Sequence, residues 1–143
     1  MNKENTIKTY TKVVLRILLG LFMVYAAIGH MSFSREEFQA QVPVWLPIGK
    51  DLVVILSGIA ELALGLAMIY GRQIKIKAGM ALALFYVLIF PGNINQYIEG
   101  IDAFGLDSDR ARFIRLGFQP VLILWALWST DSLGYIKQKL RKQ

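Results

Sequence analysis

The stretch LVVILSGIAELALGLAMIY, residues 52–70, decides the fold class because it is long and apolar enough to cross a membrane as a helix. A helix of about 20 apolar residues spans the hydrocarbon core of a bilayer. Glu61 stands at the midpoint of this stretch, where a charged side chain facing lipid costs at least about 2.5 kcal/mol. The carboxylate therefore predicts that one face of this helix lies inside a protein, and other parts of the chain must supply the remaining walls.

Three further apolar segments of similar length occupy residues 13–29, 78–95 and 113–129. Together with residues 52–70 they explain why 55% of the 143 residues are hydrophobic. Backbone polar groups in lipid must be paired within the protein, so helices are the expected spanning form. We therefore expect an all-α fold in which residues 1–143 form a single domain, an integral-membrane four-helix bundle.

Basic residues concentrate in the regions that would meet at one end of this bundle. The N-terminal segment, the connection between the second and third spans, and the C-terminal tail together hold ten lysines and arginines, and the other two connections hold four. By the positive-inside rule, both termini lie in the cytoplasm, and we expect a multi-pass protein of the cell inner (cytoplasmic) membrane. The net charge of +6 then reflects topology and contact with the lipid bilayer, so we expect no nucleic-acid partner.

The reactive side chains of the chain are few. There is no cysteine and there is one histidine, which excludes dithiol chemistry and thiolate metal sites and argues against a protein-only metal centre. We expect no metal site and no covalently held cofactor. Because no self-contained redox or hydrolytic centre is visible, whether the chain is an enzyme stays open at this point.

Small and polar residues share one face of each predicted span when positions are plotted at 100° per residue. Gly58, Glu61 and Gly65 form such a stripe in the second span, where small residues let a neighbouring helix approach closely. The equivalent faces of the other spans should meet it inside the bundle. The residues that we expect to line a polar, ligand-binding pocket there, with the loop around Trp45 as its lid, are His30, Trp45, Glu61, Asn93, Arg115 and Gln119.

Glu61 admits three interpretations. It can form a structural polar pair with Arg16 or Arg115, fixing the register of the helices; it can be a ligand or proton site; or it can be a protonated carboxyl group bonded to a nearby carbonyl. Arg16 and Arg115 lie near the ends of their spans, so each can also snorkel to lipid headgroups. His30 is either a helix-end residue or an acid–base and ligand group.

The first outer connection, residues 30–51, contains a pattern typical of a short helix. Ser34 and Glu37 have the spacing of a capping box, which predicts a helix through about Ala40. Asp107 or Ser108 is the expected N-cap of the last span. The tail SLGYIKQKLRKQ, residues 132–143, reads as a short basic amphipathic helix.

Five segments of the chain together resemble the DoxX family of small four-helix membrane proteins. The segments are GHMSF (29–33), VPVWLP (42–47), SGIAELALG (57–65), FPGNI (90–94) and RLGFQPVLILWALW (115–128). The resemblance implies a four-helix membrane fold and an association with membrane redox systems that use quinones. Related four-helix proteins include thiol-redox enzymes, whose dithiol chemistry a chain without cysteine cannot perform, and assembly chaperones of membrane receptors.

Three hypotheses for function follow. The first is a membrane protein whose polar intramembrane pocket binds a small lipophilic molecule such as a quinone, as an accessory subunit of a redox system. Catalysis would then need a membrane redox partner that carries the electron-transfer group. The second is a non-catalytic scaffold or assembly factor. The third, and weakest, is a small-solute or proton-coupled transporter, for which four helices are few unless a homodimer forms.

Overall fold

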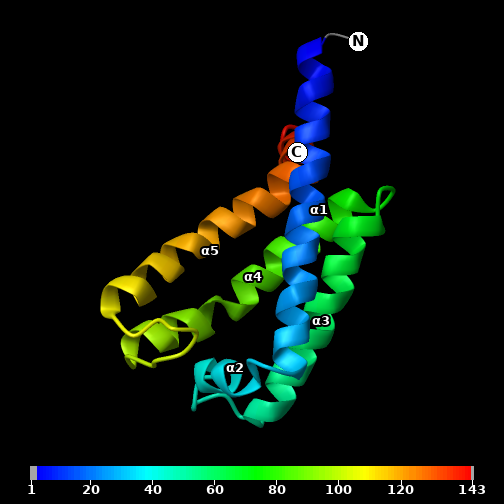
Figure 1. Ribbon diagram of the computed structural model, residues 1–143. Helices are drawn as coiled ribbons and strands as arrows, with labels where there is room; N and C mark the ends of the chain where they lie inside the picture. Colours follow the sequence, from blue (N-terminus) through cyan, green and yellow to red (C-terminus); the bar gives the residue numbers. More distant parts are fainter. Residues whose placement is uncertain (1–2, 143) are drawn as a thin grey trace.

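The computed structural model describes residues 3–142, and every regular element in that range is an α-helix (Figure 1). The helices are α1 (Lys3–Met31), α2 (Arg35–Gln41), α3 (Lys50–Tyr70), α4 (Lys75–Ile98), α5 (Asp109–Ser129) and α6 (Ser132–Leu140). The all-α expectation is confirmed. Each predicted span lies within one long helix, and the helices of the first and third spans extend beyond the predicted limits because their polar flanks continue the same turns.

Three or four of these helices are suited to cross a membrane. α1, α3 and α4 are long and apolar enough on their own, while α5 qualifies only together with α6, from which it is bent by 82°. The weaker hydropathy of α5 has a simple cause, since Asp109, Arg110, Arg112 and Arg115 all fall in its first two turns. Charges at that helix start therefore shorten the apolar part of the fourth candidate span.

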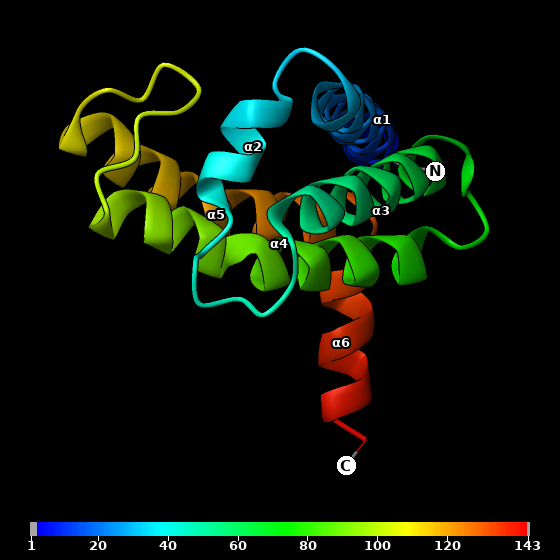
Figure 2. The same cartoon turned by 90° about the horizontal axis from the view of Figure 1, so that it is seen from below.

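The long helices form two pairs that diverge from one another like the arms of a V. α1 packs along α3, and α4 packs along α5. The arms meet near α6, where the indole Nε1 of Trp125 donates to the carbonyl of Leu15 at 3.0 Å. They separate toward α2, which lies across the open side of the V (Figures 1 and 2). We call these two ends of the molecule the α6 end and the α2 end.

Glycines fix the register of the α1–α3 pair. A Cβ atom built on Gly20 would lie 2.8 Å from the carbonyl oxygen of Gly65, and one built on Gly65 would lie 2.8 Å from that of Gly20. Only the absence of a side chain on both helices permits this backbone approach. Buried Leu19, Met23 and Met68 surround the crossing, so the hydrophobic core lies toward the α6 end.

At the α6 end, one acidic residue, Asp131, connects α1 and α4 to the junction of α5 and α6. Asp131 stands between α5 and α6 with a φ of 64°, a left-handed conformation that Asp and Asn adopt more readily than most residues. Its two carboxylate oxygens accept hydrogen bonds from Lys12 and Lys75. The predicted helix in the C-terminal tail is present as α6, and Asp131 redirects the chain into it.

The α2 end departs from one expectation of the sequence. The short helix is present, but the side chain of Ser34 makes no capping hydrogen bond. The carboxylate of Glu37 instead accepts the backbone N–H of Phe104 at 2.7 Å, which links α2 to the connection before α5. The capping-box prediction is therefore wrong, whereas the Ser108 N-cap is confirmed by a 3.3 Å bond to the N–H of Ala111.

Candidate functional site

A cavity of about 900 Å³ lies between the two arms of the V, within the size range of small-molecule binding sites. Its walls come from α1, α3, α4 and α5, and α2 and the connections at the α2 end cover it. All six residues predicted to line a polar pocket, His30, Trp45, Glu61, Asn93, Arg115 and Gln119, are found in these walls. The structure thus brings together, around one cavity, side chains that lie up to 89 positions apart in the chain.

His30 and Glu61 form the most buried polar pair of the cavity, with 5% and 6% of their surfaces exposed. The Nε2 atom of His30 lies 3.1 Å from Oε2 of Glu61. On the other side of the ring, Nδ1 lies 3.0 Å from the carbonyl oxygen of Val54. Gly58 makes room for the imidazole, since a Cβ atom there would lie 2.9 Å from Cβ of His30.

The contacts of His30 assign one side of its ring. A carbonyl oxygen only accepts hydrogen bonds, so Nδ1 of His30 donates to the carbonyl of Val54. Nε2 faces Oε2 of Glu61 at 3.1 Å, within ion-pair distance, but neither atom has a hydrogen-bond partner among the described residues. The two side chains are therefore close in space while their facing atoms stay unsatisfied.

The expected pairing of Glu61 with Arg16 or Arg115 is wrong in the part of the chain that the structure describes, where Glu61 pairs with His30. The Gly20–Gly65 crossing explains the outcome for Arg16. Arg16 is four residues beyond this crossing toward the α6 end, and Glu61 is four residues from it toward the α2 end. Eight residues of helical rise separate the two levels by about 12 Å.

Arg16 itself is buried near the apex of the V, with 6% of its surface exposed. Among residues 3–142, its Nη1 atom has no hydrogen-bond partner. Most of the side chain is therefore enclosed by the protein. It lies outside the cavity, so it is not part of the candidate site.

Two amides connect α4 to α5 in the opposite wall. Nδ2 of Asn93 donates to Oε1 of Gln119 at 3.0 Å, and Nε2 of Gln119 donates to the carbonyl of Tyr86 at 2.8 Å. α4 continues as a helix through Pro91 to Ile98, although the missing N–H of proline releases the carbonyl of Val87. Gln119 thus bonds the backbone one residue before that freed carbonyl.

Arg115 lies at the α2 end of the same wall and is half-buried. Its Nη2 atom donates to Oε1 of Gln41 at 3.3 Å, and its guanidinium lies 4.8 Å from the ring centroid of Phe104. It forms no ion pair with any carboxylate of residues 3–142. Arg112, one turn away, instead pairs with both Asp102 and Asp109.

Several residues in or next to the site escaped prediction from the sequence. Gln41 of α2 donates to Gln96 at 2.5 Å, and Gln96 donates in turn to the carbonyls of Ile101 and Ala103. Phe38 of α2 stacks on the ring of His30, with 3.5 Å between ring centroids. Gln96 could have been found, because it is three residues after Asn93 on the same helical face. Gln41 and Phe38 carried no such signal in a short helix outside the predicted spans.

The fold and the site together define a class: a bundle of helices long and apolar enough to span a membrane, with an internal cavity that carries a buried His–Glu pair. Residues 19–130 match the model of a family described as a domain of unknown function (DUF8561), and the chain belongs to this family. The matched range includes every residue that lines the cavity. No curated protein and no solved structure matches the chain.

Proposed function

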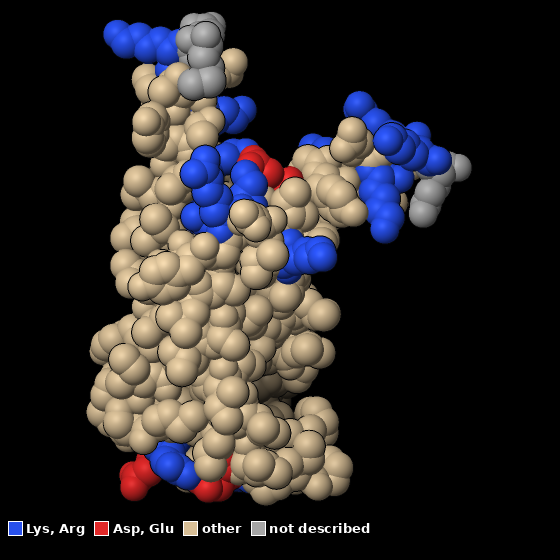
Figure 3. Space-filling view, turned by 90° about the vertical axis from the view of Figure 1, so that its right-hand side faces the viewer, with Lys and Arg blue, Asp and Glu red and all other residues tan. Residues whose placement is uncertain are grey.

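We propose that this chain is a multi-pass protein of the cell inner membrane, with both termini in the cytoplasm. The long helices expose many apolar side chains, and lysine and arginine gather at the α6 end while the middle of the molecule shows a broad uncharged surface (Figure 3). This distribution supports a bilayer around the middle and a cytoplasmic α6 end. Because the chain has no cysteine, single cysteines at Lys137 and Asp107 test the orientation. A membrane-impermeant maleimide added to intact cells should label only the Asp107→Cys variant.

We further propose that the central cavity binds a small lipophilic molecule. The observation that carries this proposal is the unsatisfied His30–Glu61 pair at the wall of a 900 Å³ cavity. Although Nε2 and Oε2 are close, their orientation does not meet hydrogen-bond geometry, and neither atom has another partner among the described residues. Buried polar atoms normally have partners. A bound molecule with an oxygen-bearing head would supply one.

A quinone is the candidate that the sequence motifs favour. The chain resembles the DoxX family, some of whose members are associated with membrane redox systems, and a quinone has an apolar body and two carbonyl oxygens. In the cavity, His30 would donate a hydrogen bond to one oxygen, and the amides of Asn93 and Gln119 line the facing wall. Redox turnover would need a partner protein that brings a flavin, haem or comparable group, so we propose an accessory role.

Binding of ubiquinone to the purified protein tests this function. The wild-type protein should bind, and Glu61→Gln and His30→Ala should each weaken binding by roughly tenfold, the effect of losing one buried hydrogen bond. Glu99→Gln is the matched control, since Glu99 caps α4 on the exposed surface outside the cavity. Failure of the wild-type protein to bind would exclude a quinone site, and equal binding by all four proteins would exclude His30 and Glu61 from it.

A further inference from the structure

The charge of the central cavity points to a more specific class of ligand. Among the residues that line it, those with acidic or basic side chains are Arg115, Glu61 and His30. Glu61 lies within ion-pair distance of His30, 3.1 Å from Nε2 to Oε2. Arg115 forms no ion pair with any carboxylate of residues 3–142. Its positive charge is therefore not compensated by the part of the chain that the structure describes.

Arg115 is poorly satisfied by the protein. Its contacts among residues 3–142 are a long 3.3 Å bond to the neutral amide of Gln41 and the face of Phe104. Guanidinium groups withdrawn from water are normally paired with an anion. Arg112, three residues earlier on α5, illustrates the usual outcome, with two carboxylates and the carbonyl of Leu106 bound. At Arg115 the protein supplies no such carboxylate.

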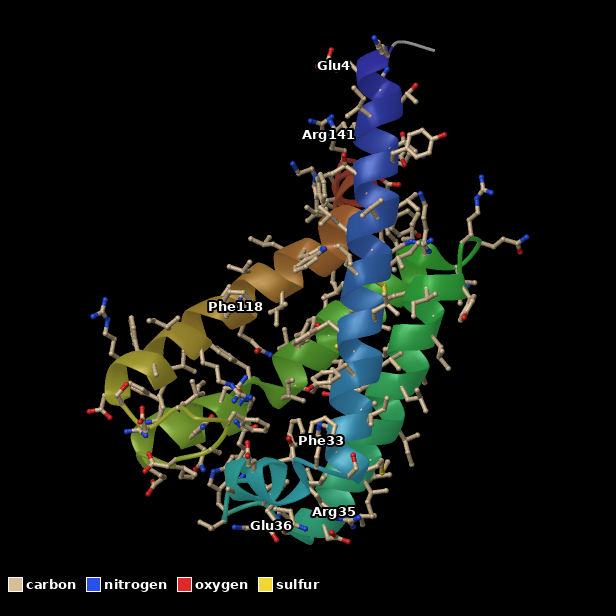
Figure 4. All side chains as sticks on the ribbon, viewed as in Figure 1. Glu4, Phe33, Arg35, Glu36, Phe118 and Arg141 are labelled. Atoms are coloured by element: carbon tan, nitrogen blue, oxygen red, sulfur yellow. The ribbon has the colours of Figure 1, made fainter. Side chains whose placement is uncertain are left out.

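The cavity opens to the outside between α1 and α5, and the side chains around this opening are apolar. These helices touch near Leu15 and Trp125 and diverge toward the α2 end (Figure 1). Exposed apolar side chains line the cavity on both sides of the opening. We call this opening the α1–α5 window, formed by Phe22, Tyr25, Phe33, Ile114 and Phe118. Phe33 and Phe118 mark its two sides in Figure 4.

We infer that the ligand is an amphiphile with an anionic head, a carboxylate or a phosphate, and a long apolar tail. This inference rests on the proposed lipophilic site but not on the quinone, which has no anionic head, and it assigns an anionic amphiphile to that site instead. The head binds Arg115, where a planar guanidinium can make two parallel hydrogen bonds to either group. The tail passes through the α1–α5 window, whose apolar side chains face the region that the bilayer would occupy. A molecule of this kind compensates the charge of Arg115 and reaches it from the membrane.

Three probes with the same sixteen-carbon chain test the class of ligand: palmitate, hexadecyl phosphate and hexadecanol. Native mass spectrometry of the purified protein, with each probe added in a mild detergent, measures binding. We expect the wild-type protein to bind at least one of the two acids roughly tenfold more tightly than the alcohol. The acid that shows the preference distinguishes a carboxylate from a phosphate head.

The variant Arg115→Met should lose this preference while keeping its affinity for hexadecanol. Arg110→Met is the matched control, because Arg110 lies on α5, is exposed and does not line the cavity, so its preference should be unchanged. Equal binding of acids and alcohol by the wild-type protein overturns the inference and leaves the lipophilic site in place. Retained preference in Arg115→Met also overturns it. Absence of all binding to the wild-type protein removes the proposed site itself.

Discussion

The Nε2 atom of His30 lies 3.1 Å from Oε2 of Glu61, and the two side chains come from neighbouring helices, α1 and α3. Both groups are buried at the wall of the central cavity. Glu61, an acidic residue in the middle of a membrane-type helix, thus has a buried basic partner. The pair explains how Glu61 is accommodated without any contact to an arginine.

The 3.1 Å contact between His30 and Glu61 predicts that removing one partner costs more stability than removing the other. In His30→Ala, Glu61 loses its compensating group, and removing one member of a buried pair typically costs about 3 kcal/mol. In Glu61→Gln, the amide N–H can still donate to Nε2, so the loss should be smaller. Thermal unfolding in detergent should rank the proteins as wild type, Glu61→Gln and then His30→Ala.

The double variant His30→Ala/Glu61→Gln supplies the control for this ranking. It removes the uncompensated carboxyl group and should therefore be more stable than His30→Ala alone. A double variant that is less stable than His30→Ala, with the two effects simply additive, would contradict the coupling of the two residues.

The close contact between Gly58 and His30 predicts that a larger residue at position 58 would displace His30. In Gly58→Ala, the new methyl group would lie 2.9 Å from Cβ of His30, closer than such atoms normally approach. Relieving the clash must move α1 from α3, and overpacking of this kind costs about 1–3 kcal/mol. We expect a lower melting temperature and weaker binding of whichever probe the wild-type protein binds.

Gly117→Ala is the matched control for Gly58→Ala. Gly117 is also within a helix, α5, but among residues 3–142 no atom outside its local backbone lies within 4 Å of the position that the new methyl group would occupy. Because alanine favours helix over glycine by about 1 kcal/mol, this variant should be as stable as the wild type or more so. Destabilisation of both variants to the same degree would mean that the Gly58 contact is not the cause.

Asp131 predicts a dependence of stability on pH. Burial disfavours its charged form, but the hydrogen bonds from Lys12 and Lys75 outweigh this effect and lower the pKa of Asp131 below its ordinary value. A carboxyl group with a lowered pKa stabilises the fold above the unfolded-state pKa, which is about 3.9 for Asp. The stabilisation is lost as the pH falls through the still lower pKa of the folded state.

Melting temperatures of the wild type and Asp131→Asn between pH 7 and pH 3 check this dependence. Asparagine tolerates the positive φ of this position, so the variant isolates the charge. The wild type should be more stable than Asp131→Asn by a constant amount from pH 7 to about 5, and this difference in stability should shrink at lower pH. It should not exceed about 1 kcal/mol, because the side chain is partly exposed to solvent. An advantage that grows on acidification would contradict the assignment.

The contacts of Arg112 predict that the connection before α5, residues 99–108, depends on this side chain for its local stability. Its guanidinium holds Asp102, the carbonyl of Leu106 and Asp109 together. In Arg112→Met these bonds are lost, so hydrogen exchange of residues 99–108 should accelerate while α1 and α3 stay unchanged. Arg110→Met, an exposed change on the same helix, should have no effect on that segment. Uniform acceleration throughout the chain would instead indicate global destabilisation.

Much of the candidate site was accessible from helical periodicity. The stripe Gly58, Glu61 and Gly65 and the equivalent positions on the other spans predicted which side chains would meet, and the six residues expected to line a pocket do line one cavity. The partner of Glu61 was not predictable, because it depends on how far α1 slides along α3. That register is determined by contact of the Gly20 and Gly65 backbones, a three-dimensional relation that a pattern within one helix does not contain.

The shape of the bundle was equally hidden from the sequence. Four spans with polar faces predict a bundle, but the divergence of the two arms depends on where they touch, near Trp125 and Leu15. The short helix α2 was predicted from Ser34 and Glu37, yet its bonds run to distant partners, with Glu37 on Phe104 and Gln41 on Gln96. Such contacts between distant segments leave no periodic signal.

The most direct test of a ligand-holding cavity is mass spectrometry of the small molecules retained after gentle purification. Ala60→Trp should fill the cavity that Ala60 lines, whereas Ala63→Trp places the same side chain on the exposed face of α3, outside the cavity. We predict that the wild type and Ala63→Trp retain the same lipophilic molecule and that Ala60→Trp, still folded, loses it. The same set of molecules in all three proteins, or none in the wild type, would contradict a ligand-holding cavity between the two helix pairs.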